Sequence, residues 1–478
     1  MVLKVYNTQT RQKEEFTPLE PGKVKMYCCG VTVYDYCHLG HARSYIVWDT
    51  VRRYLEWLDY SVQYVQNFTD IDDKILNRAK KEGVTMQDIS EKYINAYFED
   101  IRSLNVQDAD AYPRATDNIS EIYQIIQQLE TSGFAYAVSG DVFYQVNQFK
   151  DYGKLSGRKL DEQQAGASGR VDTEATKKKN SADFALWKAA KPDEPFWESP
   201  WGKGRPGWHI ECSAMVKQIL GNTIDIHCGG GDLIFPHHEN EIAQSEAANC
   251  QPLSRYWMHN GMVRISGEKM SKSLGNFTTI RDLLETVNPM VIRLFILQAH
   301  YRKPLDFTDE AISSAANGWA TLNDGLLFAS QYSEKLGWQT DNTHCNKIAI
   351  EQFNTAMDDD FNTPGGLAVL FELAKELQKE KNILVHGGEI TTTSEKLQQA
   401  WNTLVKLADV LGLEMQAEAE VSTEGMSESE IEALIQQRKQ AKQAKNYAES
   451  DRIRDELKAA GIALIDKPGG NTIWHREG

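Results

Sequence analysis

The chain lacks the features that would place it in a membrane or outside the cell. Its 478 residues contain no apolar run of about 18 residues, which is the length that a membrane-spanning helix needs. Residues 1–8 include no apolar signal region, so we do not expect export. The seven cysteines are an odd number, and free thiols or metal ligands fit them better than a disulfide framework. We therefore expect a cytoplasmic protein without membrane contact.

The chain also lacks an excess of positive charge, because 68 acidic residues outnumber 52 Lys and Arg residues and the net charge is −16. Such a surface does not attract nucleic acid as a whole, although a local basic face is still allowed. Arg438, Lys442 and Lys445 recur at i, i+4 and i+7 and so share one face of a predicted helix. A solvated helix face is the simpler explanation, so these charges alone do not predict a binding site.

The remaining composition is that of a globular protein, with 41% hydrophobic and 25% charged residues, and the length allows roughly two to four domains. Residues 24–28 and 61–68 have the pattern of strands. The helix predicted between them has an apolar stripe formed by Val47, Val51, Leu55 and Leu58. Strand, helix and strand over about forty residues predict a βαβ unit of a parallel sheet. Ligands of such sheets lie at the carboxyl ends of the strands, where His38 and His41 fall.

His38-Leu-Gly-His41 opens the predicted helix and indicates a phosphate site. The first turn of a helix has unpaired backbone N–H groups and the positive end of the helix dipole, both of which attract phosphate oxygens. Gly40 lets a nucleotide approach the backbone closely. Two incidental histidines in a turn would give the same four letters, so the tetrapeptide alone does not decide between these interpretations.

A second motif, Lys269-Met-Ser-Lys-Ser273, lies between two glycines and is typical of a flexible loop. Positioned lysines stabilise the charge that develops on a leaving pyrophosphate, although a surface loop of Lys and Ser is the alternative. The two motifs stand in this order about half the chain apart. Together they resemble the two signatures of class I aminoacyl-tRNA synthetases. That resemblance implies an ATP site formed by His38, Gly40, His41, Lys269, Ser271 and Lys272.

A third group of residues has the chemistry of zinc ligands. Cys29, Cys212, His237 and Glu241 offer two thiolates, one imidazole and one carboxylate. His237 and Glu241 are four residues apart and share a face of a predicted helix. The other spacings are long, and buried core cysteines beside a solvated acidic helix explain the residue types more simply.

Longer blocks of sequence resemble the cysteinyl-tRNA synthetase family, and the similarity runs through the whole chain. The blocks are Tyr27–Asp35, Asn67–Lys74, Gly207–Met215, Phe235–Gln244 and Lys269–Asn276. The resemblance implies that Cys29, Cys212, His237 and Glu241 hold one zinc ion. In that family zinc binds the thiolate of the substrate cysteine, which selects cysteine over serine because a thiol loses its proton far more readily. It also implies an amino-acid pocket lined by Thr69, Trp208 and Asp232.

The implied reaction is the ligation of L-cysteine to tRNA(Cys). Mg-ATP and cysteine would give cysteinyl-adenylate, and the acyl group would pass to the terminal adenosine of the tRNA. The implied catalytic residues, which stabilise charge on the phosphates, are His38, His41, Lys269 and Lys272. Arg438, Lys442 and Lys445 would contact tRNA phosphates. We expect a monomer.

The expected fold is α/β, with a Rossmann-type parallel-sheet catalytic domain that contains an insertion, then a helical bundle and a small C-terminal domain. The predicted divisions are a split catalytic domain over 1–110 and 205–265, a connective insertion over 111–204, a lysine-loop and stem-contact region over 266–307, a helical bundle over 308–413 and an anticodon-binding domain over 427–478.

Three departures from the family pattern leave questions open. Leu39 stands where the family usually has isoleucine, which is a conservative change. Cys28 competes with Cys29 for one ligand role, and we choose Cys29 because it precedes Gly30 as the family's ligand does, whereas Cys28 would face the other side of an extended strand. A role for Cys228 stays open.

Two other functions remain as alternatives. A related cysteine ligase that acts on an amino-sugar would share the catalytic half but lack the full C-terminal region, which is present here. A non-catalytic tRNA-binding paralogue would need neither the zinc ligands nor the lysines.

Overall fold

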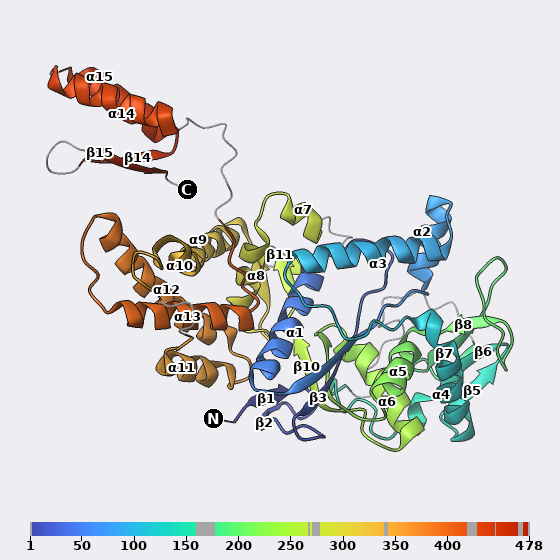
Figure 1. The fold of residues 1–478 in the computed structure, drawn as a ribbon. Coiled ribbons are helices and arrows are strands. Elements are labelled where there is room, and N and C mark those ends of the chain that lie inside the picture. Colours follow the sequence, from blue (N-terminus) through green and yellow to red (C-terminus); the bar gives the residue numbers. More distant parts are fainter. Residues whose placement is uncertain are drawn as a thin grey trace. The chain divides into compact units, whose positions relative to one another are not determined.

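The computed structural model describes the chain except for residues 1, 159–176, 266–267, 270–277, 339–342, 418–427, 445, 467–471 and 477–478. The chain separates into two compact units, Met1–Glu414 and Met415–Gly478 (Figure 1). Within the described ranges, no helix is both long enough and apolar enough to cross a membrane.

A four-stranded parallel sheet forms the centre of the first unit. Its strands are β3 (Lys23–Cys28), β4 (Ser61–Gln66), β9 (Ile224–Gly230) and β10 (Ser254–Asn260), in the order β10-β9-β3-β4. Helix α1 (Leu39–Trp57) connects β3 to β4 and completes the predicted βαβ unit. The predicted α/β class with a Rossmann-type sheet is confirmed.

The two faces of this sheet have different coverings because side chains alternate along each strand. Met26 and Cys28 of β3 belong to the large apolar core that includes α1. Tyr27 and Cys29 belong to the core on the other face. There they meet α5 (Trp208–Ile219) and α6 (Glu239–Asn249), which follows a short π-helical turn, Ile234–His238. The expectation that Cys28 and Cys29 face opposite sides is therefore confirmed.

The chain between β4 and β9, which includes the predicted insertion, passes through helices and an antiparallel sheet before it reaches α5. Its helical segments are α2 (Asp73–Glu82), α3 (Met86–Ser103), a 3-10 turn at Ala115–Asn118, α4 (Ile119–Thr131) and a 3-10 turn at Val146–Gln148. The sheet has the order β5 (Ala135–Val138), β6 (Asp141–Tyr144), β7 (Phe184–Ala189) and β8 (Gly204–Pro206). Strands of three to six residues offer too little alternation for the sequence to predict this sheet.

Helices dominate the chain after β10, including the range 308–413 that was predicted to be helical. They are α7 (Ile280–Leu284), α8 (Pro289–Leu297), α9 (Asp309–Leu326), α10 (Phe328–Tyr332), α11 (Lys347–Met357), α12 (Thr363–Val385) and α13 (Ser394–Val410). Asn288 caps α8 through Met290 N, at 2.8 Å, and Thr308 caps α9 through Ala311 N, at 3.2 Å. The remaining strands are β1 (Lys4–Asn7), β2 (Gln12–Glu15), β11 (Val263–Ile265), β12 (Glu268–Lys269) and β13 (Leu305–Phe307).

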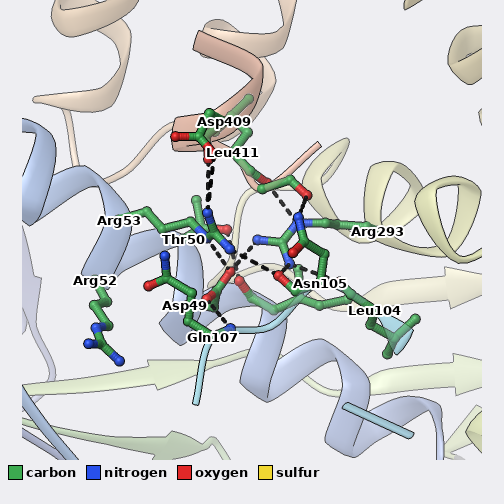
Figure 2. A network of polar contacts seen from close by, with 12 residues as sticks. Asp49, Thr50, Arg52, Arg53, Leu104, Asn105, Gln107, Arg293, Asp409 and Leu411 are labelled. Atoms are coloured by element: carbon green, nitrogen blue, oxygen red, sulfur yellow. Dashed lines mark hydrogen bonds and ion pairs between the residues drawn. The ribbon is translucent and has the colours of Figure 1, made fainter. Parts of the chain in front are cut away.

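Two buried arginines, Arg53 of α1 and Arg293 of α8, donate hydrogen bonds to the backbone at the end of α13 (Figure 2). Arg293 donates from Nε to the carbonyl oxygen of Leu411, at 2.7 Å, and pairs with the carboxylate of Asp49. Arg53 also contacts Asp49, at 2.8 Å, and donates to the carbonyl oxygen of Asp409, at 3.2 Å. A Cβ on Gly412, whose φ is +64°, would lie 2.2 Å from a guanidinium nitrogen of Arg293. The two arginines thus donate to backbone carbonyls at the end of α13, where the helix leaves acceptor capacity free.

The second unit has its own small core. Helices α14 (Glu428–Gln443) and α15 (Tyr447–Ala459) precede an antiparallel hairpin of β14 (Ile462–Asp466) and β15 (Thr472–Arg476). The buried core residues are Ile431, Ile453, Leu457 and Ile462. Gly461 has a φ of +71° where α15 turns into the hairpin, a backbone conformation that favours glycine at the end of a helix.

Candidate active site and metal centre

The predicted zinc ligands meet at the carboxyl edge of the parallel sheet. Cys29 directly follows β3, Cys212 lies on α5, His237 lies in the turn before α6, and Glu241 lies on α6. Their donor atoms all lie within 4.8 Å of one another, and all four side chains are buried. Four residues that are far apart in the sequence therefore form one cluster.

The distances in this cluster suit a tetrahedral ion. The two sulfurs of Cys29 and Cys212 are 3.8 Å apart, and Cys212 Sγ is 3.6 Å from Nε2 of His237. Oε1 of Glu241 lies 3.4 Å from Cys29 Sγ and 3.0 Å from His237 Nε2. Two sulfurs that each lie ~2.3 Å from a tetrahedral zinc are about 3.8 Å apart. The donor set and its spacing fit zinc.

The cluster contains its own charge balance. The hydrogen bond with Cys29 lowers the pKa of the Cys212 thiol to about 6, against the effect of burial. Burial alone lowers the pKa of His237, but Glu241 and then Cys212 outweigh it and raise the pKa to about 9. The two shifts favour a thiolate at Cys212 beside a protonated His237. Because a metal ion binds the deprotonated donors, it would replace the His237 proton as the source of positive charge.

A second ring of histidines surrounds the ligands, and the sequence analysis missed it. His227 Nε2 is 2.9 Å from Glu241 Oε2, and His238 Nε2 is 3.3 Å from Cys29 Sγ. These two histidines form an alternative donor set with the same Cys29 and Glu241. Because the sets share two members, they describe one metal position with outer neighbours rather than two separate sites.

The outer histidines are themselves held in a chain of hydrogen bonds. His238 Nδ1 is 2.8 Å from His259 Nε2, and His259 Nδ1 is 2.8 Å from the hydroxyl of Thr8. Burial and then the charge of His227 lower the pKa of His238 well below its usual value and that of His259 to about 3. Both rings are therefore neutral at pH 7. Such partners fix the orientation of groups that contact a metal.

Of the three residues predicted to line the amino-acid pocket, Trp208 contacts the cluster. Trp208 is half-buried and stacks on His237, with ring centroids 4.2 Å apart. Thr69 is buried and donates from its hydroxyl to Oε2 of Glu211, at 2.9 Å. Asp232 follows β9 and is exposed. Glu211 was not predicted, although its position beside Cys212, one turn after Trp208, could have indicated it.

His38 and His41 form the cap of α1. His38 Nδ1 accepts the N–H of Gly40, at 3.0 Å, and His41 Nδ1 accepts the N–H of His38, at 3.1 Å. The two rings are stacked, with centroids 3.8 Å apart. Because each Nδ1 accepts a hydrogen bond, a neutral ring carries its proton on Nε2 and can donate it to a ligand oxygen. The motif thus places two imidazole donors at a helix N-terminus.

The lysine motif is described only at its edges. The backbone of Lys269 ends β12, opposite Arg264 of β11, while Ser271 and Lys272 lie outside the described residues. After this segment the chain returns to the first motif. The N–H of Leu39 donates to Thr278 O, at 3.3 Å, and the N–H of Ile280 donates to Cys37 O, at 2.9 Å. The fold therefore brings residues 278–280, which follow this segment, against the start of α1.

Cys28 and Cys228 are paired positions on β3 and β9. Both are fully buried, and burial followed by the neighbouring Cys28 raises the pKa of Cys228 well above its usual value. Neither cysteine belongs to a group of potential metal donors among the described residues. The two thiols are core side chains.

The predicted tRNA contacts do not share one exposed face. Arg438 is buried, with 6% of its surface exposed, whereas Lys442 is exposed and Lys445 lies outside the described residues. Helical spacing alone did not reveal that the hairpin and α15 cover part of α14. In this structure the side chain of Arg438 is therefore not exposed for contact with a tRNA phosphate.

Comparisons with known proteins identify the chain. Residues 15–317 match the family described as the tRNA synthetases class I (C) catalytic domain. Residues 352–416 match the DALR domain, and residues 426–473 match the cysteinyl-tRNA ligase anticodon binding domain. The fold, the two motifs and these matches define a class I aminoacyl-tRNA synthetase.

Relatives of known function narrow the class. The chain is 65% identical to the cysteine–tRNA ligase of Gloeothece citriformis and 65% identical to that of a Nostoc species, with 100% of each chain covered. It is therefore an enzyme that belongs to the cysteine–tRNA ligase family. The fold is shared with the methionyl-tRNA synthetase of Mycobacterium tuberculosis, solved in complex with methionyl-adenylate, at a TM-score of 0.56 and 16% identity, covering 81% of this chain and 89% of that one.

Proposed function

We propose that this enzyme uses Mg-ATP to ligate L-cysteine to tRNA(Cys) through a cysteinyl-adenylate. The observation that carries the proposal is the buried cluster of Cys29, Cys212, His237 and Glu241 at the carboxyl edge of the sheet. A site of two thiols, one imidazole and one carboxylate suits zinc, and zinc prefers a substrate thiolate over an alcohol. Full-length similarity to cysteine–tRNA ligases supports the same substrate.

The activation step needs charge stabilisation rather than a general base. The cysteine carboxylate attacks the α-phosphate of ATP, and pyrophosphate leaves. His38 and His41 can donate from Nε2 to phosphate oxygens while Gly40 allows a close approach. We assign the further positive charge to Lys269 and Lys272, and a hydroxyl contact to Ser271, from the family motif.

The amino-acid pocket would contact both the thiol and the ammonium group of cysteine. Zinc, when bound, supplies a Lewis acid that favours the thiolate of the substrate. Trp208 would form one wall because it stacks on His237. Thr69 and Asp232 would face the rest of the substrate, with Asp232 suited to its ammonium group by charge. Rejection of serine by ~10⁴ or more needs no separate editing step, because a site built for one polar contact discriminates strongly against its absence.

Transfer to tRNA is favoured over transfer to an amino-sugar. The carrying observation is the match of residues 426–473 to an anticodon-binding domain, which an amino-sugar ligase would not use. The division of the chain into a split catalytic domain, insertion, stem-contact region, bundle and anticodon-binding domain stays our prediction. It is supported by the separation of the two units near residue 414 and by the three matched segments.

Cysteine-dependent exchange of pyrophosphate into ATP tests the activation step, with serine as the control amino acid. We expect exchange with cysteine only. Charging of tRNA(Cys) then separates the ligase from an amino-sugar ligase. No exchange from folded, zinc-containing protein would contradict the proposal and favour a tRNA-binding paralogue.

A further inference from the structure

A short turn in the insertion, residues 152–158, is held by one buried carboxylate of α6. Glu239 is fully buried and accepts the backbone N–H groups of Gly153 at 3.0 Å, Leu155 at 3.4 Å and Ser156 at 2.7 Å. Among the described residues, no cation lies within ion-pair distance of Glu239. The carboxylate is therefore stabilised by the turn itself, since three backbone N–H groups converge on it.

Side chains on both sides of this contact dock the turn along the same helix. The hydroxyl of Tyr152 donates to Oδ1 of Asn240, and Lys154 forms an ion pair with Glu246. The guanidinium of Arg158 lies 4.4 Å from the ring centroid of Phe235. Phe235 belongs to the same short turn as His237. The segment thus contacts both the start of α6 and the chain that leads into it.

The shape of the turn is built into its glycine. Gly153 has a φ of +99°, and a Cβ there would lie 2.1 Å from the carbonyl oxygen of Arg158. The N–H of Gly157 donates to the carbonyl oxygen of Gly153, at 2.7 Å, and closes the turn. This closed shape directs the N–H groups toward Glu239.

Leu155 connects the turn to the metal centre. Its side chain is 1% exposed and belongs to the same apolar cluster as Cys29 and Cys212. Ile242 of α6 belongs to this cluster as well. On a helix, Ile242 shares the face of Glu239, whereas Glu241 lies about 200° around the axis. The turn therefore packs against one side of α6 while the opposite side presents Glu241 to the other donors.

We propose that Glu239 is a positioning residue for the metal centre, acting through the turn at 152–158. By holding the turn, it keeps Leu155 in the apolar cluster that contains Cys29 and Cys212, and it fixes the first turn of α6, which carries Glu241. The inference rests on the zinc site of the proposed function. Groups that orient metal ligands without touching the ion change metal affinity by roughly 10–100-fold when they are altered.

The test compares zinc release from full-length wild-type protein, Glu239→Gln, Leu155→Ala and Asp225→Asn. Glutamine keeps the size of Glu239 but presents an NH₂ group to an N–H donor. Leu155→Ala removes the apolar contact and leaves the carboxylate intact. Asp225→Asn is the matched control, because Asp225 is also a buried carboxylate that accepts two backbone N–H groups, from Leu19 at 2.5 Å and Lys25 at 2.7 Å, near the amino ends of the strands.

Zinc transfer to a chromogenic chelator is followed at a temperature where circular dichroism shows all four proteins folded. We expect release from Glu239→Gln and Leu155→Ala to be about 10-fold faster or more, and release from Asp225→Asn to match wild type within about twofold. Wild-type protein that holds zinc, together with equal release from all three variants, would overturn the positioning role alone. Wild-type protein that purifies without zinc would overturn the metal assignment on which this inference rests.

Discussion

Arg293 of α8 and Asp49 of α1 form an ion pair with side chains 0% and 1% exposed. Figure 2 shows the guanidinium directed at this carboxylate and at backbone carbonyls near the end of α13. The pair joins α1, the helix that His38 caps, to α8, and Arg293 also donates to the carbonyl oxygen of Leu411 just after α13.

Removing one member of this pair should destabilise the first unit strongly. Arg293→Met leaves the Asp49 carboxylate buried with only Arg53 as its cation, and we expect a loss of about 3–5 kcal/mol. Urea unfolding measures it. Lys13→Met is the control, because its pair with Asp359 is exposed and should contribute no more than ~1 kcal/mol. Equal losses in the two variants would mean that burial of the pair does not determine its contribution.

Zinc content should distinguish the two neighbouring cysteines. Cys29→Ala removes a donor, so we expect the purified protein to lose most of its zinc and its cysteine-dependent exchange. Cys28→Ala shortens a core side chain on the other face of the sheet and should keep about one zinc per chain. Metal analysis of the two proteins checks this, and retention of zinc by Cys29→Ala would remove Cys29 from the ligand set.

The cap of α1 should matter for the activation step rather than for cysteine binding. His41→Ala removes one imidazole that is expected to donate to phosphate, and we expect exchange kcat to fall roughly 10²–10³-fold with little change in KM for cysteine. Leu39→Ile is the control, because it restores the usual family residue at a buried position and should leave exchange unchanged. A rise in KM for cysteine at constant kcat would contradict the role in phosphate binding.

His259 should make the fold sensitive to acid. Its pKa is about 3 in the folded protein because burial disfavours its charge, whereas an unfolded histidine has a pKa near ~6.5. The unfolded chain therefore binds the proton more readily, so this contribution to stability is complete above pH ~6.5 and is lost as the pH falls toward 3. The loss is up to about 1.4 kcal/mol per pH unit in that window.

His259→Gln removes the group that binds a proton in the unfolded chain but not in the folded one. The free energy of unfolding of the variant should therefore depend less on pH, by about one proton in the slope. Urea unfolding at pH 7 and at pH 5 gives the difference for each protein. If the variant and the wild type lose the same stability between these values, His259 is not the group that responds.

Lys442 is the exposed member of the predicted tRNA contacts. We expect Lys442→Ala to raise KM for tRNA roughly fivefold, corresponding to about 1 kcal/mol, with cysteine-dependent exchange unchanged. Arg438→Ala should instead lower the melting temperature, because that side chain is buried. Kinetics of tRNA charging and thermal melting separate the two effects, and unchanged charging by Lys442→Ala would exclude the contact.

Elements with a strong period could be predicted from the sequence alone. The stripe at Val47, Val51 and Leu55 predicted α1 because one face of that helix packs on the sheet. The caps Asn288 and Thr308 are likewise local features, since each side chain accepts a backbone N–H of the helix that it precedes. Burial of Arg438 was not predictable, since it depends on packing between elements that helical spacing does not contain.

The metal centre is the part of the site that residue spacing could not predict. Its four donors come from the end of β3, from α5 and from the turn and first residues of α6. No spacing rule links such positions, so residue types alone favoured an ordinary core, and only the resemblance to a family predicted the cluster. His227 and His238 were missed because their contacts arise only when β9 and α6 are packed together.

Gly412 has no side chain, and the Arg293 guanidinium occupies the space where a Cβ at position 412 would lie. Substitutions at positions 49, 293 and 412 should therefore be energetically coupled. A larger residue at 412 would displace the side chain of Arg293. Without Arg293, the buried carboxylate of Asp49 loses one of its cations, which favours replacement of Asp49 as well. A change at 412 should therefore be more harmful in this chain than in a background where positions 49 and 293 are both apolar, although the φ of +64° disfavours a side chain at 412 in either background.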